Sequence, residues 1–466
     1  LKKKLDAGIA NLLPAQQPDG YIGNYAEGKR CGDGWDVWGM KYTMMGLLHY
    51  YDATGDANAF EACKRLCDYM INNLGPGAKR TIGGTGNYSG MPSCSALEPV
   101  MWLYNRTKDK KHLDFADFIV KEMTEREDGP RLLDLASVPV ADRSPLPRPK
   151  TFWEDYIRSR SKAYEMMSCY QGLLEYCEVT DRQDLLGAAI ASARNIAQEE
   201  INLAGGAASH EFWFHGAEHQ HEPYGRLQET CVTITWMRLC EKLLVLTGNP
   251  EYADQFEKTF YNAYLASLSR DGATFAAYTP LTGYRSEGHL HCRMHTNCCN
   301  ANGPRGFLSF LRSILQAKDD EVFLNYYASS VAEIEVPALK EKARFEIHTL
   351  YPVEGKVDIR FRLAKPMKFK FSVRIPGCTA ANRMKVNGSD VEPQYLEGPR
   401  YTMHERVWNP GDVVELNFGL PVKAHVARDH VAFTRGPVLL ARDSRFGDGD
   451  IAAEIRRWEF KPDRLP

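Results

Sequence analysis

A recurring helical hairpin constrains the fold of this chain more than any other feature. The same phrase occurs four times in the first two thirds of the sequence: an apolar helical segment, a polar break centred on a threonine, and a second helical segment. Each break carries Gly, Asp or Asn, which end one helix and cap the next. On both sides apolar residues recur at the i, i+3, i+4 and i+7 positions of a helix. The breaks lie 53, 73 and 67 residues apart, at Thr54, Thr107, Thr180 and Thr247.

Repeated helical hairpins bury their apolar faces only by packing on one another. A closed toroid of helix pairs does this better than an open solenoid when long loops cluster on one face. The sequence therefore predicts an (α/α) barrel for residues 1–320. Because the chain begins at Leu1, within the helical phrase LKKKLDAGIANLL, we expect its natural N-terminal part to be missing.

The hydrophobic period changes near residue 320. Residues 343–350 and 356–363 alternate apolar and polar positions, as a half-buried strand does. Turn signals follow at short intervals, at IPG (375–377), NG (387–388), NPGD (409–412) and RGP (435–437). We predict an antiparallel β-sandwich over 321–466, cut off at its C-terminal end, and so an α+β multidomain chain. Since no low-complexity linker precedes the sandwich, we expect it to pack against helices.

Composition excludes several partners. Of the 466 residues, 44% are hydrophobic and 25% are charged, and the formal net charge is −2. A charge so close to zero gives no electrostatic footprint for nucleic acid or for an anionic membrane. The sequence also holds no apolar run of the roughly 20 residues that span a bilayer, so we expect no membrane insertion. The oligomeric state is open.

Two adjacent cysteines, Cys298 and Cys299, stand apart from the other ten, which are scattered without repeated spacing. Glu229 and Cys231 are two residues apart, so on an extended segment they face the same way. Together the four residues offer three sulfurs and one carboxylate oxygen, a donor set that suits tetrahedral zinc. On spacing alone, an alternative stays open in which these cysteines are ordinary buried thiols.

A histidine-rich segment, HEFWFHGAEHQHEPYGRLQETC over 210–231, offers a rival zinc cluster. His215 and His219 have the i, i+4 spacing of metal-binding helices. However, the HExxH pattern is absent, and Gly216 and Pro223 favour a loop. We therefore expect these histidines either to line a polar cleft, where residues such as His215 could hydrogen-bond a sugar, or to lie on a solvated loop. The histidines concerned are His210, His215, His219 and His221.

The phrase NCCNANGPR resembles the paired-cysteine motif of glycoside hydrolase family 127, the β-L-arabinofuranosidases, and of their relatives in the domain of unknown function 1680 group. ETC (229–231) resembles the Glu-x-Cys that joins the cysteine pair on zinc in that family, and HEFWF resembles its Glu-x-aromatic phrase. Weaker similarities run in the right order along the whole chain, at QQPDGYIG (16–23), GWDVWGMKYTMMGLL (34–48), VRIPG (373–377), KVNG (385–388), WNPGD (408–412) and RGPV (435–438).

The resemblance implies an (α/α)6 barrel followed by a β-sandwich, and a retaining exo-glycosidase that releases a terminal β-L-arabinofuranose-like sugar from plant-type glycans. It implies Cys298 as the nucleophile and Glu211 as the acid/base, while Glu229, Cys231 and Cys299 complete the zinc site with Cys298. Coordination to zinc ionises a thiol that is otherwise mostly protonated at neutral pH. A carboxylic acid with a raised pKa protonates the leaving oxygen.

The choice of acid/base rests on local composition. Phe212 and Trp213 follow Glu211 and supply the apolar surroundings that raise a carboxyl pKa. The loop between Glu211 and Glu229 is about two residues longer than the family pattern suggests. Glu218, which lies inside this loop, is therefore the alternative acid/base.

The chain also departs from the family. Met40-Lys41 stands where many members carry His-Lys, and Asn300-Ala301 stands where Pro-Pro is typical. If Lys41 binds substrate, it could meet a sugar carboxylate, which makes an acidic or branched sugar of pectic side chains an alternative substrate. Otherwise Lys41 is an ordinary surface lysine.

Three other functions compete on this scaffold: a polysaccharide lyase, a non-catalytic glycan-binding protein and a purely structural zinc site. The compartment also stays open. Periplasmic members within the resemblance favour a periplasmic or secreted protein, whereas zinc-bound thiolates also tolerate the reducing cytosol.

Overall fold

The structure, a computed structural model, describes residues 2–32, 34–143, 159–222, 225–285, 298–391, 400–442 and 447. Its contacts divide the chain into two units, Leu1–Gln198 and Glu199–Pro466. Pro223 and nearly all of the last 20 residues, where we predicted the start of a further element, lie outside the described residues.

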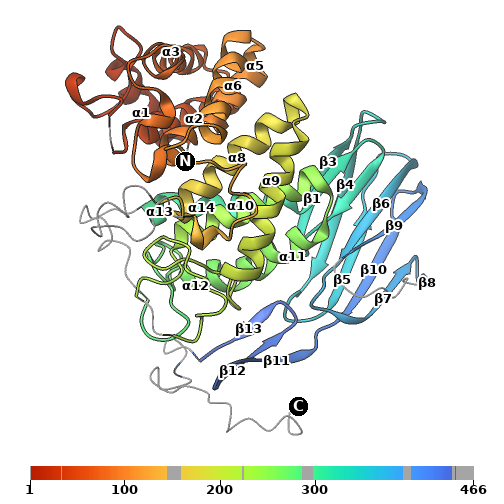
Figure 1. Ribbon diagram of the computed structural model, residues 1–466. Helices are drawn as coiled ribbons and strands as arrows, with labels where there is room; N and C mark the ends of the chain where they lie inside the picture. Colours follow the sequence, from red (N-terminus) through yellow and green to blue (C-terminus); the bar gives the residue numbers. More distant parts are fainter. Residues whose placement is uncertain are drawn as a thin grey trace. The chain divides into compact units, whose positions relative to one another are not determined.

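The first unit is helical throughout its described part (Figure 1). Short 3-10 turns connect its helices, and a π-helical turn, η6 (Ile196–Glu200), follows the last of them. The α-helices are α1 (Lys2–Leu12), α2 (Asp36–Thr54), α3 (Ala57–Leu74), α4 (Met91–Cys94), α5 (Leu97–Thr107), α6 (Lys110–Thr124), α8 (Ala163–Thr180) and α9 (Gln183–Asn195).

The four predicted hairpins are present, and they share one turn chemistry. Each of the four threonines is the last residue of its helix, and its Oγ1 donates a hydrogen bond to the carbonyl four residues earlier. The next residue adopts a left-handed conformation that ends the helix, as Gly55, Lys108, Asp181 and Gly248 do. In three of the turns an Asp or Asn side chain then caps the following helix: Asp56, Asp109 and Asn249.

The second unit joins helices to β-sheets. Its helices are α10 (Thr230–Thr247), α11 (Pro250–Thr259), η7 (Phe260–Tyr264), α12 (Leu265–Ser267), α13 (Cys298–Asn302) and α14 (Pro304–Ser313). Its strands are β1 (Leu315–Lys318), β2 (Glu321–Leu324), β3 (Ser330–Val336), β4 (Glu341–Thr349), β5 (Lys356–Phe361), β6 (Met367–Ile375), β7 (Ala380–Val386), β8 (Ser389–Val391), β9 (Arg400–Trp408), β10 (Val413–Gly419), β11 (Val422–Ala427), β12 (His430–Arg435) and β13 (Val438–Leu440).

Two of the sheets pack face to face through aromatic side chains. Phe345 and Phe361 from the sheet β3-β4-β5-β10-β7-β8 contact Phe371 and Trp408 from the sheet β1-β2-β6-β9, and the rings of Phe361 and Trp408 stack at 4.3 Å. This is the core of the predicted sandwich. The pairing is antiparallel except between β2 and β6, which run parallel. The reason is topological, because the chain crosses to the other sheet for β3, β4 and β5 before it returns.

The NG turn at 387–388 forms as expected. Asn387 and Gly388 connect β7 to β8, and both have positive φ, at 52° and 79°. A two-residue hairpin needs positive φ at both central positions to match the twist of its strands. The small sheet β11-β12-β13 follows the sandwich, and Asn262 of η7 binds the main chain of Pro437 and Leu439 there.

A buried arginine joins the sandwich to α11. Arg374 on β6 is 0% exposed, and its guanidinium donates to Glu257 at 2.7 Å, to Asp254 and to the carbonyl of Asn325. The hydroxyl of Tyr351 donates to the other oxygen of Glu257. Because the charges of Asp254 and Glu257 are largely removed from water, Arg374 is required to compensate them.

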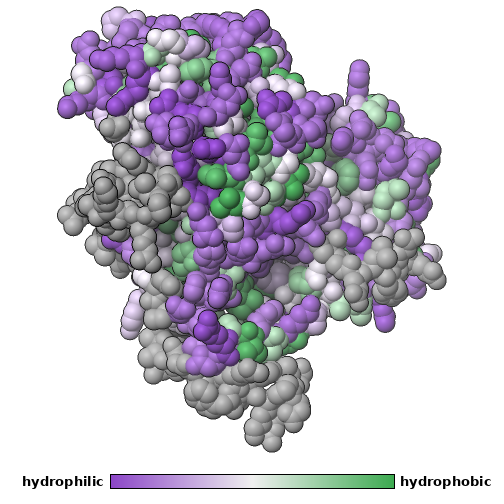
Figure 2. All heavy atoms as spheres, in the orientation of Figure 1, coloured by the Kyte–Doolittle hydropathy of each residue, from purple (hydrophilic) through white to green (hydrophobic). Residues whose placement is uncertain are grey.

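Hydrophilic side chains predominate over α3, α5 and α6 on the face that Figure 2 shows. Among the helices that the structure describes, none has the length and apolar character needed to cross a membrane.

Replacing Arg374 tests the connection between β6 and α11. We expect Arg374→Met to lower the free energy of unfolding by about 3–5 kcal/mol, because the buried carboxylate of Glu257 and the part-buried carboxylate of Asp254 lose their cation. The control is Lys365→Met, which removes an exposed partner of Glu341 and should change stability little. Urea unfolding followed by circular dichroism measures both, and equal losses would contradict the role of Arg374.

Candidate metal centre and active site

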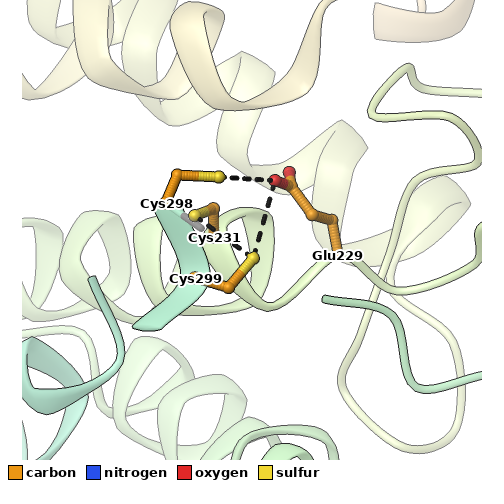
Figure 3. A group of neighbouring side chains, drawn as sticks. All are labelled: Glu229, Cys231, Cys298 and Cys299. Carbon is orange, nitrogen blue, oxygen red and sulfur yellow. Dashed lines mark hydrogen bonds between the residues drawn. The ribbon is translucent and has the colours of Figure 1, made fainter. Parts of the chain in front are cut away.

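The four predicted metal ligands come together in the second unit (Figure 3). The ligand atoms of Glu229, Cys231, Cys298 and Cys299 all lie within 4.8 Å of one another. The sulfurs of Cys231 and Cys299 are 3.6 Å apart, and Oε1 of Glu229 lies 3.8 Å from the sulfur of Cys298 and 3.9 Å from that of Cys299. Among the described residues, this group alone gathers three or more potential ligands so closely.

The start of two helices positions these side chains. Glu229 is the residue before α10, and its carboxylate makes no capping hydrogen bond, while Cys231 lies in the first turn. Cys298 and Cys299 open α13. Because the peptide dipoles of α10 point their positive end at this group, they favour thiolate and carboxylate charge there.

The geometry suits one tetrahedral ion. A metal–sulfur bond of about 2.3 Å and a metal–oxygen bond of about 2.1 Å place ligand atoms about 3.5–3.8 Å apart at the corners of a tetrahedron. Three of the six separations, at 3.6–3.9 Å, match this spacing, and all six are within 4.8 Å. Cys231, Cys299 and Glu229 are buried, whereas Cys298 is exposed. The group can therefore hold a metal ion, with one thiol on its accessible side.

Without a cation, the thiols of Cys231 and Cys299 hold their protons. Hydrogen bonding to Cys298 and Cys299, and then burial, raise the pKa of Cys231 well above its ordinary value. The hydrogen bond from Cys231 lowers the pKa of Cys299, but Cys298, burial and the charge of Glu229 outweigh it, so this pKa is also well above the ordinary value. Binding of a metal ion must therefore expel protons.

Glu211 lies in a tight turn next to this group. Ser209 and Phe212 bind each other through both main-chain groups, so His210 and Glu211 are the two central residues of the turn, with φ of 50° and 73°. The amide of His210 donates to the carbonyl of Arg226, and that of Gln228 donates to Ala208. This ladder ties the turn to the segment that leads directly into Glu229.

Tyr278 connects Glu211 to the metal-binding group, and no motif in the sequence pointed to it. Its main chain pairs with that of Glu229, and its hydroxyl donates to Oε1 of Glu211 at 3.1 Å. Burial, followed by the charge of Glu211, raises the pKa of Tyr278, so the phenol keeps its proton and stays a donor. Tyr278 thus orients the Glu211 carboxylate.

The alternative acid/base lies in a different environment. The side chain of Glu218 is 67% exposed, and Arg428 is 3.9 Å away. The carboxyl of Glu218 therefore stays in contact with water. Trp213 is buried, whereas the apolar surroundings of the Glu211 carboxyl stay a prediction.

The histidines of the same segment do not gather into a cluster. His210 contacts Ser209, His215 contacts Glu199, and His221 contacts the carbonyl of Glu218. Glu222 is shared, since its Oε1 lies 2.9 Å from His219 and 3.7 Å from His221. None of them belongs to the group of potential metal ligands found among the described residues.

Lys41 lies in the first unit and is 1% exposed, so the interpretation of an ordinary surface lysine was wrong. Its ammonium lies 3.7 Å from Oε2 of the buried Glu98 and 4.8 Å from the ring centroid of Trp38. Because Glu98 already balances this charge, the pair offers no uncompensated cation to a sugar carboxylate.

Two family models match consecutive parts of the chain. Residues 1–312 match the model of the β-L-arabinofuranosidase GH127 catalytic domain, and residues 321–420 match that of the GH127 middle domain. A non-reducing end β-L-arabinofuranosidase of Bifidobacterium longum is 22% identical over 99% of this chain and 74% of its own length.

Solved structures show the same fold. A GH127 β-L-arabinofuranosidase from Geobacillus stearothermophilus T6 aligns with a TM-score of 0.73 and 21% identity, over 94% of this chain and 72% of its own. A second GH127 β-arabinofuranosidase aligns with a TM-score of 0.72 and 23% identity, over 94% and 71%.

This chain belongs to glycoside hydrolase family 127. It is therefore a glycoside hydrolase whose substrate is a glycan. Family membership sets aside the alternatives of a polysaccharide lyase and of a non-catalytic glycan-binding protein.

Metal affinity tests the protonated state of the thiols. We expect one ion per chain, with Zn²⁺ as the probe. Because at least Cys231 and Cys299 must each release a proton, affinity should fall by at least about 100-fold between pH 7.5 and 6.5. Competition with a chelator measures it.

Two serine variants provide the comparison. Cys299→Ser should lose the metal, whereas Cys240→Ser, at a buried cysteine of α10 outside the group, should keep it. Affinity that does not change with pH would contradict the release of protons.

Proposed function

We propose that this chain is a retaining exo-glycosidase that releases a terminal β-L-arabinofuranose-like sugar from plant-type glycans. The observation that carries the proposal is the exposed thiol of Cys298 within an otherwise buried group of one carboxylate and two thiols. The β-L-arabinofuranosidase activity of its relatives supports the sugar. We further propose that residues 1–320 contain an (α/α)6 barrel, which the four similar helical hairpins support. We also propose a sandwich domain over 321–466.

The metal is proposed to be zinc, because three sulfurs and one oxygen in tetrahedral spacing suit its ligand preferences. Glu229, Cys231, Cys298 and Cys299 would hold it. When bound, it supplies the positive charge that keeps the thiols ionised at neutral pH.

The Cys298 thiolate attacks the anomeric carbon and forms a carbon–sulfur bond as the glycosidic carbon–oxygen bond breaks. Glu211 gives its proton to the leaving oxygen, and Tyr278 holds that carboxyl in place. The Glu211 carboxylate then accepts a proton from water, which displaces the thiolate from the sugar. Two displacements at one carbon retain its configuration.

A purely structural metal site is the competing interpretation. It would leave the thiol of Cys298 without a reason to be exposed while its three neighbours are buried. It would also leave the strained turn of Glu211 unexplained, since positive φ at non-glycine residues costs about 1–3 kcal/mol and is typical of functional sites.

Lys41 and His215 stay proposed sugar contacts, and the pairing of Lys41 with Glu98 favours a neutral sugar over an acidic one.

Activity on p-nitrophenyl β-L-arabinofuranoside tests the roles of both residues. We expect Cys298→Ala to lower kcat at least about 10³-fold, because it removes the nucleophile. Glu211→Gln should lower kcat/KM about 10²–10⁴-fold on substrates with a poor leaving group. Proton NMR of the first product should show the β-anomer.

Cys240→Ala is the matched control, since it removes a buried thiol of α10 outside the metal-binding group. Full activity in Cys298→Ala, or release of the α-anomer first, would overturn the mechanism.

A further inference from the structure

The buried carboxylate of Glu200 binds the main chain close to Glu211. Glu200 is 0% exposed, and it accepts hydrogen bonds from three successive amides: those of Phe214 at 3.0 Å, His215 at 3.1 Å and Gly216 at 3.1 Å. Burial raises the pKa of Glu200, whereas the three amides lower it. Three hydrogen-bond donors offset part of the free-energy cost of burying one carboxylate.

The local backbone is shaped for this contact. His215 has a φ of 59°, and alternation between right- and left-handed conformations turns successive amides toward one point, which makes an anion-binding nest. Gly216 allows the close approach, because a Cβ there would lie 2.8 Å from the Glu200 carbonyl oxygen and 2.8 Å from the ring of Phe214. The sequence FHG is therefore suited to receiving a carboxylate.

Glu200 is the last residue of the π-helical turn η6, and the preceding residue, Glu199, adds a further hydrogen bond between η6 and the 214–217 segment. The carbonyl of Glu199 accepts from the amide of Ala217 at 2.9 Å, so four consecutive amides, 214–217, are fixed to the end of η6. Isolated π-helical turns occur often at functional sites.

The segment that carries Glu211 is thus held at both ends. On one side, the main chains of Ala208 and His210 are hydrogen-bonded to the segment that leads into Glu229. On the other side, the nest begins at Phe214, three residues after Glu211. Between them, His210 and Glu211 adopt positive φ, which costs about 1–3 kcal/mol per residue and persists only where flanking contacts impose it.

We propose that Glu200 is a positioning residue of the glycosidase, which fixes the strained turn so that the Glu211 carboxyl meets the leaving oxygen. This inference rests on the proposed function, and in particular on Glu211 as the acid/base. Glu200 acts only through the main chain of 214–216. Its removal should therefore impair proton donation and leave attack by Cys298 intact.

A comparison of leaving groups separates these two steps. A 2,4-dinitrophenolate needs no proton to depart, whereas an alkoxide does. We expect Glu200→Gln, which replaces one accepting oxygen by a donor, to lower kcat/KM about 10–100-fold on methyl β-L-arabinofuranoside and less than about threefold on the dinitrophenyl glycoside. Glu211→Gln should show the same pattern with a larger effect.

The matched control is Glu257→Gln. Glu257 is also a buried glutamate of the second unit, 1% exposed, but it binds Arg374 and Tyr351 away from the turn. Any loss in this variant should be equal on both substrates, because it reflects only the fraction of folded enzyme. An equal loss on both substrates in Glu200→Gln would overturn the positioning role.

Hydrogen exchange gives a second measurement that does not depend on the sugar. In Glu200→Gln we expect the amides of 214–216 to exchange at least about tenfold faster than in the wild type, with no change in α10. Unchanged exchange would overturn the inference. If the wild type hydrolyses no arabinofuranoside while exchange increases as expected, the proposed substrate fails and Glu200 still holds the turn.

Discussion

The rest of this structure depends on one constraint: the side chains of the metal-binding group would repel one another if all of them were ionised. Three thiols and a carboxylate lie within 4.8 Å, and three of the four residues are buried. Such a group is stable when the thiols keep their protons or when a cation neutralises them. The raised pKa values of Cys231 and Cys299 describe the first state, and the tetrahedral spacing suits the second. The start of α10, the opening of α13 and the main-chain pairing of Tyr278 with Glu229 all serve to hold these groups together.

A second constraint comes from the turn of Glu211. Its backbone is strained, so it depends on hydrogen bonds from both flanks: the ladder with Arg226 and Gln228, and the nest filled by Glu200. Tyr278 then joins this turn to Glu229 through its hydroxyl and its main chain. The proposed acid/base and the proposed metal ligands are thereby parts of one hydrogen-bonded assembly within the second unit, which is what two-step catalysis at a single carbon requires.

Much of the local structure could be predicted from the sequence because it depends on short-range chemistry. The four threonine breaks end helices through hydrogen bonds within one turn, and the NG turn of β7 and β8 needs only positive φ at two residues. The alternation over 343–350 predicted β4 for the same reason. The parallel pairing of β2 with β6, the nest of Glu200 and the burial of Lys41 against Glu98 could not be predicted, since each joins residues 14 to 57 positions apart in a way that no local pattern records.

The sequence by itself determined which groups are available: two adjacent cysteines, a Glu-x-Cys phrase, repeated helical hairpins and a strand-rich C-terminal part. Only the tertiary structure decided how those groups act. It brought Cys231 to 3.6 Å from Cys299 across 68 positions of the chain, buried three ligands and exposed the fourth, and separated Glu211 from the solvated Glu218. The physical reason is that residue type fixes the chemistry of a group, whereas its pKa, its exposure and its partners depend on the long-range packing that surrounds it.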